Sequence, residues 1–194
     1  MCPDEEERPS GSLDFLTVGP FPAALAQDLV ASASRRLPLP CRLLRGPGLT
    51  APRIEGRDQL DADRLLAALE VAAAESPPGH VLMGLTTHDI GSPLFTFFFG
   101  RARLHGRAGL VSVARLAPTY YGLPDDPDVT ARRAVIEILH EFGHVAGLTH
   151  CVDFGCLMHL TTNVESLDAR GAGYCEACLA RLPDDLRPHA PGRR

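Results

Sequence analysis

Hydrophobic and polar positions follow two different periods along this chain, and these periods predict the order of its elements. Short apolar runs bounded by Gly or Pro predict three buried strands, at 13–19 (LDFLTVG), 41–45 (CRLLR) and 80–86 (HVLMGLT). Residues 22–36 have a Pro near their start and predict a helix. Residues 59–74 (QLDADRLLAALEVAAA) predict an amphipathic helix that ends before a Pro-Pro pair.

The second half of the chain predicts a hairpin followed by a long helix. The extended runs 94–104 (LFTFFFGRARL) and 108–116 (AGLVSVARL) are joined by a short His-Gly-Arg turn. The three Phe residues at 97–99 could form an aromatic ligand box, but strand core explains them more simply. Residues 129–146 (VTARRAVIEILHEFGHVA) carry apolar side chains at helical spacing. The order of elements predicts an α/β fold, a mixed twisted sheet with one antiparallel edge strand.

The ends of the chain differ in composition from its centre. Residues 1–12 and 184–194 are polar or Pro-rich, and we expect them to be flexible tails around one domain at 13–183. The 194 residues suit a single hydrophobic core. No apolar run approaches the roughly 18 residues of a membrane span, and the acidic start is unlike a signal peptide. We therefore expect a monomeric cytoplasmic protein that does not bind membranes.

Charge and cysteine content restrict the possible partners. The formal net charge is −5, which argues against a nucleic-acid partner. Arg101, Arg103 and Arg107 could form an anion-binding patch, although a solvated strand edge is the simpler interpretation. In the cytosol, the six cysteines are expected to be metal ligands or free thiols rather than disulfides.

The last predicted helix carries His140-Glu141-x-x-His144. Residues four apart share one helix face, so both imidazoles can reach one zinc ion, while Glu141 can take a proton from a zinc-activated water. Had the helix continued, His150 would lie about 15 Å further along the axis than His140. Because Gly147 accepts a positive φ, we expect the helix to end there and the chain to return His150 as a third ligand. Three ligands leave the open position that a catalytic zinc needs.

Four cysteines after this helix predict a second site. Cys175 and Cys178 form a C-x-x-C pair whose thiolates can hold one ion, and Cys151 and Cys156 form a looser pair. Together they are expected to bind a structural zinc with four thiolates. A redox pair at Cys175 and Cys178, or unrelated buried thiols, are the alternatives. The cysteines without comparable partners are Cys2 and Cys41.

The spacing of these residues resembles a known family. HExxHxxGxxH is the metzincin pattern, and Met158 fits the methionine turn beneath the metal, with core filling as the alternative. The continuation Cys-x4-Cys-x-Met, with C-x-x-C sixteen residues later, resembles the archaemetzincins, small single-domain zinc metallopeptidases. The similarity covers 136–182 and extends to the strand pair before it. The resemblance implies a metzincin-like α/β fold with two zinc ions, one catalytic and one structural, and a peptidase activity that is aminopeptidase-like in some members. It implies His140, His144 and His150 as catalytic zinc ligands, Glu141 as general base, and Cys151, Cys156, Cys175 and Cys178 as structural zinc ligands.

Some parts of the site are left open by the sequence. Astacins have a tyrosine just after the methionine turn, whereas His159 and Leu160 follow it here. His159 and the Tyr120-Tyr121 pair are therefore candidates to stabilise the oxyanion, with packing as the alternative. Residues 88–89 (His-Asp) either border the cleft or form a surface turn, which is the simpler interpretation.

Peptide hydrolysis is the favoured function, and two rivals remain. A zinc-dependent endoribonuclease shares the H-x3-H-x5-H spacing, but that family lacks the Glu after the first His and the cysteine quartet. A catalytically idle zinc-binding or interaction protein would be expected to lack a ligand or the base, and none is lost here. A peptide or protein substrate could add to the edge strand near 95–103 in extended form.

Overall fold

Four parallel strands and one antiparallel strand form the central sheet, in the order β2-β1-β4-β7-β6. The computed structural model describes residues 11–44, 49 and 52–187. The parallel strands are β1 (Ser12–Val18), β2 (Cys41–Leu43), β4 (His80–Thr86) and β7 (Ala108–Ser112). β6 (Gly100–Ala102) pairs antiparallel with β7 and ends the sheet. The predicted α/β class with one antiparallel edge strand is therefore confirmed.

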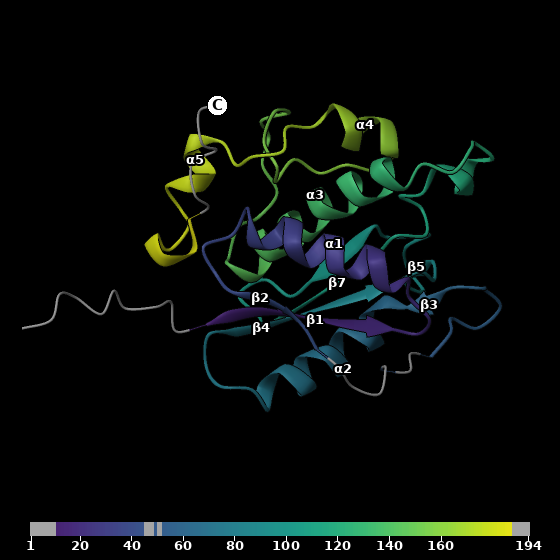
Figure 1. Cartoon of the computed structure of the whole chain (residues 1–194), viewed down its shortest axis with the longest axis horizontal. Coiled ribbons are helices and arrows are strands. Elements are labelled where there is room, and N and C mark those ends of the chain that lie inside the picture. The colour runs from purple at the N-terminus through teal and green to yellow at the C-terminus, as the bar shows by residue number, and fades with distance from the viewer. Residues whose placement is uncertain (1–10, 45–48, 50–51, 188–194) are drawn as a thin grey trace, which may run out of the picture.

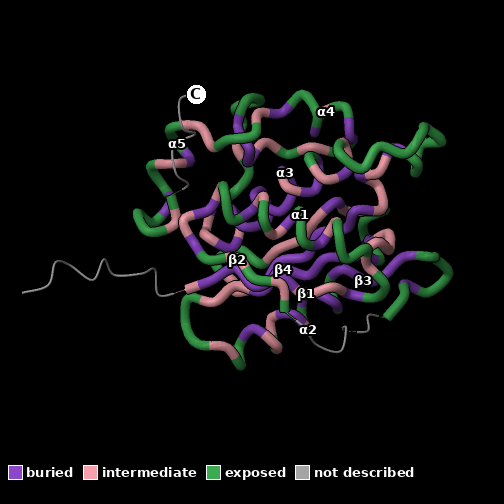
Figure 2. The backbone as a smooth tube through the Cα atoms, in the orientation of Figure 1, coloured by how far each residue is buried: buried purple, intermediate pink, exposed green. Residues whose placement is uncertain are grey.

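Helices cover both faces of this sheet. α1 and α3 lie on one face, and α2 covers the other (Figure 1). Phe15 and Phe142 are fully buried in the layer beneath α1 and α3, while Leu65 and Leu110 are fully buried in the layer beside α2. Buried residues are concentrated in the strands and on the sides of the helices that face them (Figure 2). The α-helices are α1 (Ala23–Ser34), α2 (Ala62–Ala74), α3 (Pro127–Val145), α4 (Val164–Ala169) and α5 (Glu176–Leu179).

α2 begins three residues later than its apolar pattern predicts. The Asp61 side chain accepts hydrogen bonds from the backbone N–H groups of Asp63 and Arg64, both at 3.1 Å, and so caps the helix. The residues before it form β3 (Leu60–Asp61), which pairs with β5 (Ile90–Gly91) in a second, two-stranded sheet. The capping residue therefore separates an extended segment from the helix.

The predicted strand at 94–104 is wrong over its first half. Ser92 and Phe95 exchange backbone hydrogen bonds of 3.2 Å, so the chain turns there instead of extending. Phe98 makes only an isolated bridge with Ile90, and regular pairing begins at Gly100. Of the three consecutive Phe residues only Phe99 is buried, so strand core does not explain all of them.

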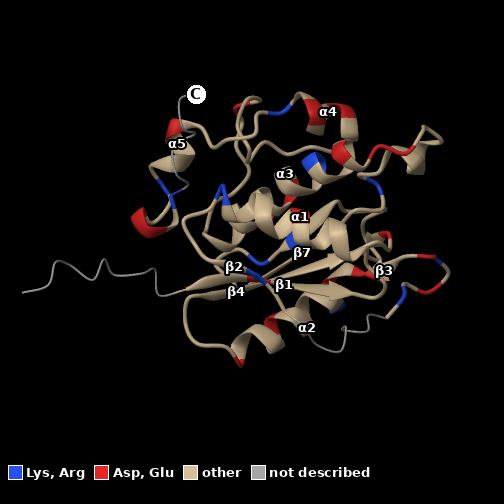
Figure 3. Cartoon of the chain, in the orientation of Figure 1, with Lys and Arg blue, Asp and Glu red and all other residues tan. Residues whose placement is uncertain are grey.

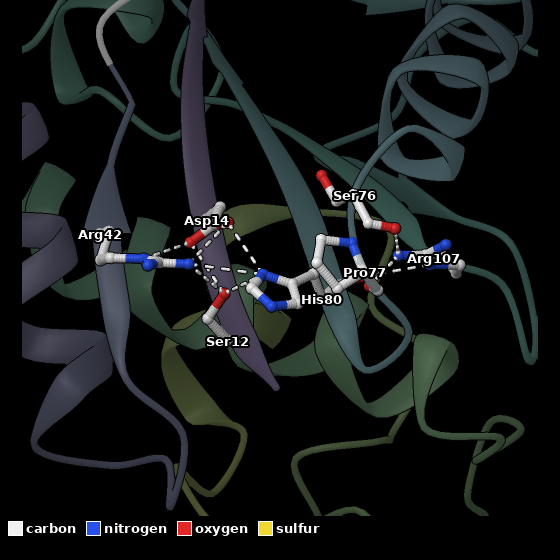
Figure 4. Close-up of polar contacts among 7 residues, drawn as sticks. All are labelled: Ser12, Asp14, Arg42, Ser76, Pro77, His80 and Arg107. Atoms are coloured by element: carbon white, nitrogen blue, oxygen red, sulfur yellow. Dashed lines mark hydrogen bonds and ion pairs between the residues drawn. The ribbon is translucent and has the colours of Figure 1, made fainter. Parts of the chain in front are cut away.

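A polar cluster joins the starts of three strands (Figure 4). Ser12 and Asp14 of β1 are buried, and Arg42 of β2 donates from Nε to Asp14 at 2.9 Å. The Ser12 hydroxyl lies 2.8 Å from Nδ1 of His80 on β4. Burial alone would raise the pKa of Asp14, but hydrogen bonds from Arg42, Ser12 and His80 lower it. The cluster therefore holds the register of the strand starts.

Two of the three arginines that could form an anion patch make contacts within the chain instead. Arg101 pairs with Asp63 at 2.9 Å. Arg107 donates to backbone carbonyls, including that of Ser76 at 2.9 Å and that of His80 at 3.3 Å (Figure 4). Basic and acidic residues are interspersed along the ribbon (Figure 3). Two of the three arginines are thus engaged within the chain.

Parts of the predicted tails are outside the structure. Residues 1–10 and 188–194, which include Cys2, lie outside the described residues. Ser12 opens β1, and Asp184–Leu186 forms a short 3-10 helix. Within the described ranges, no helix is both long enough and apolar enough to cross a membrane.

The cap of α2 gives a test of this fold. We expect Asp61→Ala to lower the free energy of unfolding by about 1 kcal/mol, because two N–H groups lose their acceptor. Asp61→Asn keeps a side-chain oxygen and should remain close to the parent in urea denaturation. Equal losses in both variants would contradict the capping role.

Candidate metal centres

α3 carries the predicted active-site residues, and its start is fixed by a cap and a proline. Asp126 caps its start by accepting from the N–H of Val129 at 3.0 Å, and Pro127 occupies the first turn. On one face of the helix, Ile138, Leu139 and Phe142 are buried in the hydrophobic core. The opposite face is directed toward β6 and a cavity, and the predicted histidines and glutamate lie on that face.

The helix ends in a turn that the sequence predicts. Gly147 has φ +94°, its N–H donates to the carbonyl of His144, and the N–H of Leu148 donates to that of Gly143. This pair of bonds is the Schellman motif. The expected end of the helix at Gly147 is confirmed, and the chain returns toward α3 with His150.

The three histidines converge on one point. Their ligand nitrogens all lie within 4.8 Å of one another, and the Nε2 atoms of His140 and His144 are 3.1 Å apart. Two nitrogens on one tetrahedral zinc, each at about 2.1 Å, would lie about 3.4 Å apart. The ring of His150 lies 5.4 Å from that of His140 and 4.9 Å from that of His144, between centroids. The set of donors and its spacing fit a zinc ion.

Backbone carbonyls determine which ring nitrogen of His140 and of His144 is protonated and which can bind a metal ion. Nδ1 of His140 lies 2.8 Å from the carbonyl of Leu157, and Nδ1 of His144 lies 2.8 Å from the carbonyl of Leu148. A carbonyl only accepts, so each Nδ1 carries the proton and each Nε2 keeps its lone pair. Burial, with the charge of Arg170, lowers the pKa of His140 to about 3, and burial with His140 lowers the pKa of His144 to about 4. Both rings are therefore neutral, the form in which a histidine can bind a metal ion.

Glu141 points into the same space. Its side chain is buried, and Oε2 has no hydrogen-bond partner among the described residues. Burial, reinforced by the neighbouring Glu137, raises its pKa well above the usual range. A Cβ on Gly100 of β6 would lie only 2.6 Å from Oε1 of Glu141. Gly100 therefore makes room for the carboxylate beneath the edge strand.

The four cysteines converge on a second point. Their sulfur atoms lie within 4.8 Å of one another, with Cys151 3.8 Å from Cys175 and Cys156 3.7 Å from Cys178. Thiolates on one tetrahedral zinc, each at about 2.3 Å, would lie about 3.8 Å apart. A disulfide would need about 2.05 Å, and the short contacts do not join Cys175 to Cys178. The arrangement fits a four-thiolate zinc site rather than the alternative redox pair. The remaining described cysteine, Cys41, is half-buried in β2.

Met158 lies beneath α3, as a methionine turn requires. It is fully buried, and its sulfur would be 2.5 Å from a Cβ placed on Gly143. It also packs in the apolar cluster that contains Cys156 and Cys178. The N–H of Cys151 donates to the Met158 carbonyl at 2.9 Å. Met158 therefore lies against the active-site helix at Gly143 and within the cluster of cysteines.

A cavity of about 600 Å³ opens over the histidines. Apolar side chains form most of its wall: Phe95, Phe97, Phe98, Phe99, Leu104 and Leu160. The proposed oxyanion residues His159, Tyr120 and Tyr121 do not line it, nor do His88 and Asp89. Nδ1 of His159 faces the Cys151 carbonyl, the Tyr121 hydroxyl donates to the Arg115 carbonyl, and Asp89 pairs with Arg115.

Residues that sequence reasoning missed also surround the histidines. Glu137 lines the cavity one turn before Glu141, and Arg170 reaches His140 from the segment after α4. The buried hydroxyl of Tyr174 donates to the carbonyl of Leu139 at 2.7 Å. Only Glu137 carries a signal in the sequence, because a carboxylate at that helical spacing shares a face with the site.

Comparisons with known proteins show which family this chain resembles. The model of peptidase family M54 matches residues 33–184. The archaemetzincin of Methanocaldococcus jannaschii is 41% identical over 104 residues, 54% of this chain and 58% of that protein. The chain thus spans less than two thirds of that relative. The archaemetzincin of Pyrococcus furiosus is 35% identical over 138 residues, 71% of each protein.

A solved structure shows the same fold. The zinc-dependent peptidase from Methanocorpusculum labreanum superposes with a TM-score of 0.75 at 24% identity, covering 89% of this chain and 100% of that one. The family match covers most of the chain, including every predicted ligand. This chain belongs to peptidase family M54.

Proposed function

We propose that this chain is a zinc-dependent peptidase. The observation that carries the proposal is a buried carboxylate, Glu141, with one unpartnered oxygen beside three converging histidines. His140, His144 and His150 would hold the catalytic zinc, and Cys151, Cys156, Cys175 and Cys178 would hold a structural one. An idle zinc-binding protein would not need a free carboxylate in an open cavity.

Zinc and Glu141 would have different roles in the proposed hydrolysis. When bound, zinc supplies a Lewis acid that polarises the scissile carbonyl and acidifies a water molecule. With the charge of the zinc beside it, the Glu141 carboxyl would ionise despite its burial, take a proton from water as general base and return it to the leaving amine as general acid. The endoribonuclease alternative gains no support, because the cavity wall is apolar rather than basic.

The edge of the sheet is the proposed substrate platform. β6 is the terminal strand and contributes Gly100, Arg101 and Ala102 to the cavity. An extended peptide could pair with its free edge and place a peptide bond over Glu141. We propose aminopeptidase-like cleavage as the finer form of this activity, on the resemblance to the archaemetzincins.

Removing the base should separate catalysis from metal binding. We expect Glu141→Gln to lower kcat by about 10²- to 10⁴-fold, because no group takes the proton from water. Zinc content, measured by mass spectrometry, should be unchanged. Glu70→Gln, on α2, serves as the matched control. A Glu141→Gln variant that kept its rate on a peptide library would refute the assigned base.

Blocking the amino terminus tests the finer proposal. An aminopeptidase should cleave a free-amine peptide and leave its N-acetylated counterpart intact. Product masses from paired libraries would show the difference. Equal cleavage of both would identify an endopeptidase and leave the coarser proposal standing.

The shared backbone at His150 and Cys151 predicts coupling between the two metal centres. Zinc-loaded protein should hold two zinc ions per chain, and a chelator should remove the histidine-bound ion first, because that site has only three protein ligands. Cys175→Ser should also weaken zinc binding at the histidines by about 10-fold or more, since it loosens the anchor of His150. Cys41→Ser is the control. Unchanged affinity at the histidines in Cys175→Ser would show that the centres are independent.

A further inference from the structure

A charged side chain lies in the apolar interior beside the first histidine. The Arg170 side chain is 0% exposed, and the Glu137 side chain is 7% exposed. Nη2 of Arg170 donates to Oε2 of Glu137 at 3.2 Å. Removing an ion pair from water costs several kcal/mol per ion before their attraction offsets it. A buried pair at this position therefore calls for a role beyond stability.

Arg170 connects three parts of the site. Nη1 donates to the carbonyl of His159 at 2.9 Å. The same nitrogen lies 2.9 Å from Nδ1 of His140, in a packing contact rather than a hydrogen bond, because Nδ1 donates to the Leu157 carbonyl and both nitrogens are donors. His159 directly follows Met158, and Leu157 provides the carbonyl that accepts from His140. The planar guanidinium thus fills the space between α3 and the turn that carries the tautomer-fixing carbonyl.

We propose that Arg170 is a positioning residue for the metal centre, and that Glu137 holds Arg170 in place. Arg170 binds the carbonyl of His159 and so holds this turn of the chain in place. The carbonyl of Leu157, two residues earlier, then stays within hydrogen-bond distance of Nδ1 of His140. Its guanidinium also blocks the ring of His140 from turning away from the other two histidines. Nε2 of His140 is then held toward the metal. The inference rests on the proposed zinc site but not on peptide hydrolysis.

A second ion pair provides an internal control. Arg133 of α3 donates to Asp168 of α4 from Nε at 2.8 Å and from Nη2 at 2.6 Å. This pair joins α3 to α4, and Asp168 lies only two residues before Arg170 in the chain. Arg133 does not line the cavity. Breaking this pair should loosen α4 without changing the environment of His140.

The test compares zinc affinity in the full chain, measured by competition with a chromophoric chelator. We expect Arg170→Gln and Glu137→Gln each to weaken zinc binding at the histidines by about 10- to 100-fold, the usual effect of losing a group that orients a ligand. Arg170→Lys should also bind zinc more weakly than the parent, because an ammonium group cannot reproduce the planar set of donors. Arg133→Gln should keep parental zinc affinity, even where its melting temperature falls.

The double variant Glu137→Gln/Arg170→Gln separates positioning from stability. It removes both buried charges, so its melting temperature should recover relative to Arg170→Gln. Its zinc affinity should stay low, because nothing restores the contact with the His159 carbonyl. Recovered affinity in the double variant, or an equal loss in Arg133→Gln, would overturn the proposal. Glu141→Gln, with normal zinc affinity, shows that loss of hydrolysis is a separate outcome.

Discussion

The metal centre depends on the turn that ends α3. A straight continuation of the helix would carry His150 away from His140, and only the left-handed backbone at Gly147 reverses the chain. A Cβ at Gly147 would lie 2.2 Å from the ring of His105, which belongs to the turn between β6 and β7. The N–H of His105 also donates to the carbonyl of His144. The end of the helix and the edge of the sheet therefore fix each other.

The same turn explains why two metal centres occupy one stretch of chain. After the reversal, adjacent side chains serve opposite sites, His150 toward the histidines and Cys151 toward the other cysteines. Met158 packs against both segments, because its sulfur fits under Gly143 of α3 while its carbonyl accepts from the N–H of Cys151. A small domain has little core with which to immobilise a loop ligand. A zinc ion bound by the four cysteines next to the third histidine would supply that rigidity.

Local chemistry made most of the site predictable from the sequence. Helical spacing places His140 and His144 on one face, and a glycine after the last turn predicts the reversal. Apolar periodicity predicted the order of strands and the antiparallel edge, but it misassigned residues 94–98. An apolar run has the same appearance whether it lies in a sheet or along a cavity wall, and here Phe95 is 54% exposed at the cavity. Gly100 and Arg170 gave no signal, because their roles arise only when distant segments pack together.

The contacts of Arg170 and Gly100 suggest how the fold controls the reacting groups from two sides. Gly100 leaves room for Glu141 beneath the edge strand, and a larger residue there would displace the carboxylate. Arg170 acts from the segment after α4, where it contacts the histidine that precedes Glu141 in the chain. Both contacts bear on neighbouring residues of one helical turn, so a shift of α3 would disturb ligand and base together. The close packing of α3 between these contacts is what keeps the metal-binding nitrogen and the carboxylate in a fixed relation.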